Sequence, residues 1–248
     1  MAFSSVALLL HIAAGFLALL IGPVAMFSRK GGAWHLGAGR TYVWAMLVVV
    51  VTAAILALRG LDTFLFALAV ISFYLTFTGW RAALRKGDRI GRAAPLDWAV
   101  SGATVLFGLG LMSYGLMSDG LMSYGLVTQA PGAGGAASLV ALVMGALIAL
   151  LAVPHLIRYR RGSTGKGWLI RHIIGMLSAY IATFTAFAVT NLDFLPPAIG
   201  WVLPTVLGSL GITLTVRHYR TRLERGRPLA ELVHLRRERP GRPSRRPA

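Results

Sequence analysis

Long apolar stretches alternate along this chain with short segments that carry nearly all of its charge. The apolar stretches cover approximately residues 4–27, 40–58, 63–84, 95–116, 136–157, 168–192 and 197–216. An α-helix rises about 1.5 Å per residue, so about 20 apolar residues cross the ~30 Å hydrocarbon core of a bilayer. Since each stretch is close to that length, the pattern predicts an all-α, polytopic membrane bundle of seven transmembrane helices.

The basic residues are distributed unevenly between these stretches. Three basic residues precede the second stretch, one precedes the third, five precede the fourth and five precede the sixth. None precedes the fifth or the seventh, and eleven follow the last stretch. Short loops rich in Lys and Arg remain in the cytoplasm. We therefore expect the N-terminus outside and the C-terminus inside. Because no basic residue precedes the first stretch, we expect it to stay as a helix and not to be cleaved.

Two domains of very different composition are expected. Residues 1–220 form the membrane domain, and residues 221–248 form an arginine-rich cytoplasmic tail whose low apolar content predicts that it is largely disordered. Such a tail either stays solvated or lies as a short interfacial helix on anionic lipid headgroups. Residues 111–125 repeat a five-residue unit, LMSYG, LMSDG, LMSYG, which we interpret as an outer loop, either a duplication or a lid bearing Tyr114, Asp119 and Tyr124.

Composition narrows the function classes. Hydrophobic residues make up 56% of the chain and charged residues 13%, against ~25% charged residues in soluble domains. The net charge of +17 lies at helix ends and not on a folded surface with base-reading groups, which argues against nucleic-acid binding. The absence of cysteine excludes disulfides and thiolate chemistry. No paired carboxylates, serine triad or HExxH motif indicate an enzyme.

Polar side chains inside the membrane are costly and usually have a partner or a function. His11 lies on the outer half of the first helix, at the depth of Tyr180, Thr183 and Asn191 on the outer half of the sixth. We expect these four residues to form a polar site between the first and sixth helices. It either holds the two helices in register or takes part in proton transfer or ligand binding.

The remaining membrane histidines lie at the opposite depth. His172 is roughly 20 Å from His11 along the membrane normal, so one metal ion cannot bridge them. His155 lies at about the depth of His172, and His35 belongs to the predicted loop before the second helix. These three residues are the candidates for a metal or haem site; singly, each is a hydrogen-bonded interfacial histidine.

Several motifs resemble those of a known family. The segments are HIAAGFLALLIGPVAMFSRKGGAWHLGAGRTYVWAM (residues 11–46), FYLTFTGWRAALR (73–85), RHIIGMLSAYIATFTAF (171–187) and WVLPTVLG (201–208). Together they resemble the uncharacterised bacterial multi-pass inner-membrane proteins of the domain of unknown function 2306 family. The matching positions are His11, Lys30, Gly31, His35, Gly39, Arg40, His172, Tyr180, Thr183, Thr185 and Asn191.

The resemblance implies a fold, an orientation and a place in the bacterial inner membrane, but no reaction. Its cytoplasmic loop motif comprises Lys30, Gly31, His35 and Arg40, although Leu36 stands where the family has arginine. We expect a small-molecule or proton-linked transporter or sensor. The alternatives are a non-enzymatic scaffold and a haem-binding redox protein. The expected partners are the bilayer and anionic lipid headgroups. The sequence leaves open whether the chain forms a homo-oligomer.

Overall fold

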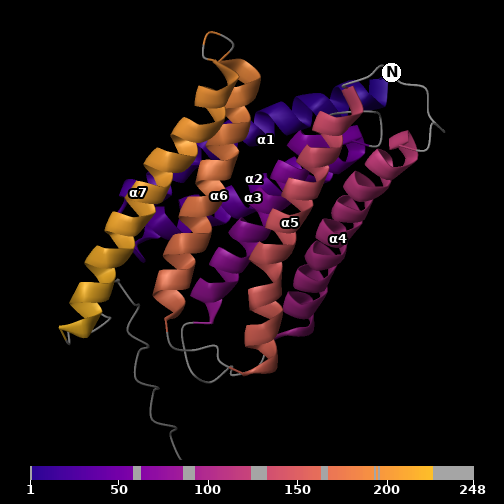
Figure 1. Cartoon of the computed structure of the whole chain (residues 1–248). Coiled ribbons are helices and arrows are strands. Elements are labelled where there is room, and N and C mark those ends of the chain that lie inside the picture. Colours follow the sequence, from indigo (N-terminus) through magenta and orange to yellow (C-terminus); the bar gives the residue numbers. More distant parts are fainter. Residues whose placement is uncertain are drawn as a thin grey trace, which may run out of the picture.

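The computed structural model describes residues 2–57, 63–85, 93–123, 133–162, 167–192, 194 and 196–225, and within these ranges the regular structure is helical (Figure 1). The helices are α1 (Ala2–Phe27), α2 (Ala33–Ala57), α3 (Thr63–Leu84), α4 (Pro95–Ser123), α5 (Ala133–Arg160), α6 (Trp168–Asn191) and α7 (Pro197–Glu224). Each contains a stretch that is long and apolar enough to cross a membrane. The predicted all-α, multi-pass class is therefore confirmed. The tail from residue 226 onward lies outside the described residues.

Helix α2 begins at Ala33, earlier than the predicted start at residue 40. The prediction that His35 and Arg40 belong to a loop is therefore wrong, because both lie in the helix. The turn before α2 is short enough to allow this early start. Gly31 takes a positive φ of 77°, which costs a residue without a side chain little, and the Gly32 amide donates to the Arg29 carbonyl at 3.0 Å.

Helix α4 continues to Ser123, through two copies of the five-residue unit and into the third. The interpretation of residues 111–125 as a loop is therefore wrong for most of the repeat. Leucine and methionine favour helix, and Gly115 allows close packing, since a Cβ there would lie 2.6 Å from the Ser138 carbonyl oxygen of α5. Tyr124 and the side chain of Asp119 lie outside the described residues.

Helix α3 is the centre of the bundle and α7 its edge. Helix α3 contacts α2, α4, α5 and α6, and most of its apolar stretch is buried. Helix α7 packs on α6, and almost none of the residues in its apolar stretch are buried. In Figure 1 it lies at the side of the bundle. An exposed apolar helix suits contact with lipid.

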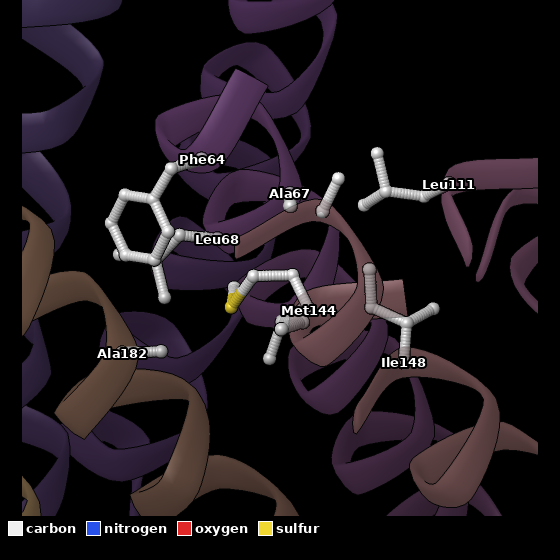
Figure 2. Close-up of a cluster of buried hydrophobic side chains, with 9 residues drawn as sticks. Phe64, Ala67, Leu68, Leu111, Met144, Ile148 and Ala182 are labelled. Carbon is white, nitrogen blue, oxygen red and sulfur yellow. The ribbon is translucent and has the colours of Figure 1, made fainter. Parts of the chain in front are cut away.

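The two largest apolar clusters hold six of the described helices together. The larger cluster, drawn in Figure 2, joins α3 to α4, α5 and α6 and consists of Phe64, Ala67, Leu68, Ile71, Leu111, Ala141, Met144, Ile148 and Ala182. The other joins α1, α2 and α6 through Ala14, Ala18, Tyr42, Ala45, Met46, Val49 and Ala179. Small residues recur because close van der Waals packing, and not the hydrophobic effect, drives helix association in lipid.

The crossing of α3 and α6 is especially close at two glycines. A Cβ built on Gly175 would lie 2.6 Å from the Gly79 Cα. The Nδ1 of His172 lies 2.9 Å from the Gly79 carbonyl oxygen, which can only accept, so His172 donates this hydrogen bond. The crossing brings the C-terminal end of α3 beside the N-terminal end of α6.

Replacing Gly79 by alanine tests this crossing. The new Cβ would lie 2.8 Å from the Met176 nitrogen and 3.0 Å from the Gly175 carbonyl carbon, so the backbones must separate. We expect a loss of about 1–3 kcal/mol, the usual range for overpacking, measured as thermal unfolding in detergent. Gly102→Ala is the control, since nothing lies within 4 Å of that position. Equal melting temperatures for the two variants would contradict the close crossing.

Candidate functional site

His11 bonds to α2, and not to the predicted partners on α6. Its Nδ1 lies 3.0 Å from the Thr52 Oγ1. The hydroxyl proton of Thr52 is already directed to the Val48 carbonyl oxygen at 2.7 Å, so the Thr52 oxygen accepts from the His11 Nδ1–H. This half-buried histidine therefore joins α1 to α2, while Tyr180 and Thr183 have other partners.

Tyr180 does contact α1, where a proline leaves a backbone carbonyl without its helical donor. Pro23 has no N–H, which leaves the Leu19 carbonyl without its helical donor. The Tyr180 hydroxyl donates to that carbonyl at 3.1 Å. A Cβ on Gly22 would lie 2.5 Å from the Tyr180 ring, so glycine gives the ring access. Gly22 and Pro23 thus form the docking position for Tyr180.

The other two residues of the predicted polar site are not part of this contact. The Thr183 hydroxyl donates to the Ala179 carbonyl at 2.9 Å and lies 3.1 Å from the Tyr42 hydroxyl of α2. Asn191 is exposed at the end of α6 and donates to the Phe187 carbonyl of its own helix. His11, Tyr180, Thr183 and Asn191 therefore have separate partners. Their contacts account for helix packing in this region.

Two of the three other candidate histidines meet. The rings of His35 and His172 have centroids 6.1 Å apart and lie at 80° to each other. The Nδ1 of His35 donates to the Ala25 carbonyl at 2.9 Å, so this residue links α2 to the end of α1. With the His172 bond to Gly79, the pair connects α1, α2, α6 and α3.

His155 has different neighbours. Its ring packs edge-on against Tyr74 and lies near Tyr159, with centroid distances of 5.6 and 6.3 Å. Its Nδ1 donates to the Leu151 carbonyl at 3.1 Å. Within the described ranges, no group of three or more His, Cys, Asp or Glu residues is arranged to hold a metal ion.

The predicted loop motif ends one helix and begins the next. The Lys30 ammonium reaches the carbonyls of Ala25, Met26 and Ser28, which the end of α1 leaves without helical donors. Burial lowers the pKa of Lys30. Arg40 is exposed on α2. Lys30 and Gly31 therefore form the turn between α1 and α2, and His35, within α2, bonds back to the end of α1.

A buried ion-pair cluster lies where α3 ends and α4 begins. Asp97 is fully buried in the first turn of α4 and receives two hydrogen bonds from Arg81, Nε to Oδ1 at 2.7 Å and Nη2 to Oδ2 at 3.0 Å. Oδ2 also accepts from the Ala94 amide at 2.8 Å and pairs with Arg85. A buried carboxylate needs such partners because desolvating it is costly.

Beside this cluster is a pocket of about 220 Å³ that we call the arginine pocket. Its lining residues are Leu75, Thr78, Arg81, Ala82, Arg85, Leu151, His155, Arg158, Tyr159, Arg171, Ile174 and Gly175. These residues belong to α3, to Arg85 directly after α3, to α5 and to α6. Four of these described lining residues are arginines and none is acidic. Asp97 behind the lining pairs with two of the four, so the described arginines still carry more positive charge than this carboxylate compensates.

Arg85 is the most deeply buried of these arginines, with 8% of its surface exposed. Its guanidinium lies over the Tyr159 ring, 5.7 Å from the centroid. Burial and then the charge of Arg81 lower the pKa of Arg85, but a guanidinium stays charged in proteins. Its Nε makes no hydrogen bond to any described residue. A buried, charged donor in this position calls for an acceptor.

Sequence reasoning missed this pocket. It used the arginines only as evidence of membrane topology. One signal was present, since Arg81 and Arg85 are four residues apart and share a helix face. No pattern in the sequence indicates that Arg158 of α5 and Arg171 of α6 meet that face.

Comparison of the chain with protein-family models, curated proteins and solved structures gives no match. The family resemblance therefore stays a prediction from the motifs. The geometry of the arginine pocket is the evidence that bears on function.

Neutralising the buried carboxylate tests the ion-pair cluster. Asp97→Asn keeps the shape of the side chain but leaves Arg81 and Arg85 without their counter-charge. We expect a loss of about 3–5 kcal/mol, as for other buried pairs that lose one partner, measured by chemical or thermal unfolding in detergent. Glu224→Gln, at an exposed acid near the end of α7, is the control and should stay within about 0.5 kcal/mol of wild type. Equal losses of stability in Asp97→Asn and Glu224→Gln would contradict the stabilising role of the ion-pair cluster.

Proposed function

We propose that this protein is a multi-pass membrane transporter or sensor for a small anion that binds in the arginine pocket. The observation that carries this proposal is the set of four arginines from three segments around one pocket, with no acidic residue among its described lining residues. Guanidinium groups match carboxylate and phosphate oxygens with two parallel hydrogen bonds. The Arg81–Asp97 pair already shows this geometry beside the pocket.

The size of the pocket favours a small ligand. Pockets for drug-sized molecules occupy about 300–1,000 Å³, whereas this pocket has about 220 Å³. The Nε of Arg85, which makes no hydrogen bond within the described part of the chain, supports a bound acceptor, because satisfying a buried charged donor contributes about 1.5–3 kcal/mol. An anion would also reduce the repulsion between the arginines.

We also propose an orientation for the site. The pocket lies at the end of the bundle that holds the C-terminal ends of α3 and α5 and the N-terminal ends of α4 and α6. The connections at this end carry most of the Lys and Arg residues of the membrane portion. By the positive-inside rule, this end faces the cytoplasm of a bacterial inner membrane, and the N-terminus lies outside. The anion therefore enters from, or is sensed in, the cytoplasm.

Charge removal in the pocket tests the proposal. Arg158→Gln and Arg171→Gln should each weaken anion binding roughly tenfold to hundredfold, because a hydrogen bond to a charged group contributes about 1.5–3 kcal/mol. Binding is measured by calorimetry on the purified full-length protein at constant ionic strength, with phosphate, sulfate, acetate and butyrate as probes. Arg160→Gln is the matched control, because Arg160 is exposed on the same helix end and does not line the pocket.

Two results would contradict the proposed function. One is that the wild-type protein binds none of the probes. The other is that Arg160→Gln weakens binding as much as the two pocket variants, since the effect would then come from surface charge alone. Uptake of the bound anion into vesicles containing the protein separates a transporter from a sensor.

A further inference from the structure

The arginine pocket is polar toward the end of the bundle and apolar toward the middle of the helices, the part that we call its inner end. On α3, Leu75 lies ten residues before Arg85, about 15 Å farther from the end of the bundle along the helix. On α5, Leu151 lies seven residues before Arg158, about 10 Å farther. The packing of Tyr74 against His155 sets the two helices side by side at this depth. Both helices therefore place leucine at the inner end and arginine toward the end of the bundle.

The inner end of the pocket offers an anion few hydrogen-bond donors. The Nδ1 of His155 already donates to the Leu151 carbonyl. The Thr78 hydroxyl donates to the Tyr74 carbonyl at 2.9 Å. A hydrated polyanion such as phosphate would contact the guanidinium groups but leave Leu75 and Leu151 facing water. A ligand with an anionic head and an apolar tail would satisfy both ends.

We infer that the ligand is a short-chain aliphatic carboxylate, with its head at the arginines and its chain against Leu75 and Leu151. This inference rests on the proposed function and names its ligand class. The carboxylate oxygens accept from the guanidinium groups, including the buried Arg85, as the Asp97 carboxylate accepts from Arg81. A pocket of about 220 Å³ is smaller than the ~300–1,000 Å³ of pockets for drug-sized ligands, which favours a carboxylate of four to six carbons over a membrane fatty acid.

The experiment is a chain-length series on the purified full-length protein at constant ionic strength. The probes are acetate, butyrate, hexanoate and decanoate, with inorganic phosphate and uncharged hexanol for comparison. Affinity should rise roughly fourfold per added methylene from acetate to butyrate, the value for burying one methylene, and fall again at decanoate. Phosphate and hexanol should both bind more weakly than hexanoate.

A pair of adjacent variants locates the chain. Leu151→Ala enlarges the inner end and should shift the preferred carboxylate to a longer chain. Leu150→Ala, at a side chain 69% exposed on the same helix, should leave the preference unchanged. If both variants shift the preference equally, the chain does not lie against Leu151 and the inference is wrong.

The outcomes separate this inference from the proposed function. If phosphate binds more tightly than every carboxylate, without dependence on chain length, the ligand class is wrong while the anion site stands. If hexanol binds as tightly as hexanoate, the head group is not recognised and the ligand class is wrong. If no probe binds, the proposed function and this inference both fail.

Discussion

The buried carboxylate of Asp97 is the constraint on which this end of the bundle depends. Its hydrogen bonds from Arg81 and the Ala94 amide, and its pairing with Arg85, hold the end of the central helix α3 to the start of α4. Breaking such a pair would leave charges buried without compensation. With α3 fixed there and pressed against α6 at Gly79 and Gly175, the arginines of three segments gather at one pocket.

The chain therefore maintains like charges in a partly desolvated space. Repulsion between such charges is much stronger than in water, and it opposes the packing that Asp97 stabilises. Arg81 and Arg85 compensate the buried Asp97, whereas the further positive charge of Arg158 and Arg171 at the same pocket adds repulsion. Local features that cost stability are typical of binding sites. The polar contacts of α1 have a different character, because His11 and Tyr180 each make a hydrogen bond to a neighbouring helix. That difference is why the arginine pocket, and not the α1–α6 contact, is the proposed site.

Much of the fold could be predicted because bilayer thickness sets helix length, and the seven helices of the described residues follow from apolar runs. The early start of α2 could not be predicted, since His35 and Arg40 are polar yet lie in the helix that follows the Lys30–Gly31 turn. The site was harder. The depth of a side chain in the membrane follows from its residue number, but which helix lies beside it at that depth does not. Sequence analysis therefore predicts α6 as the partner of His11, whereas His11 bonds to Thr52 of α2.

The most direct test of the arginine pocket is a comparison of unfolding with and without a bound anion. Thermal unfolding of wild type and Arg158→Gln is measured in a buffer with a bulky, non-binding counterion, and again with saturating anion. If the arginines repel one another until an anion binds, Arg158→Gln is the more stable protein without the anion and gains less stability from it. If Arg158→Gln is less stable in both buffers and gains as much as wild type, the arginines serve structure alone and the account is wrong.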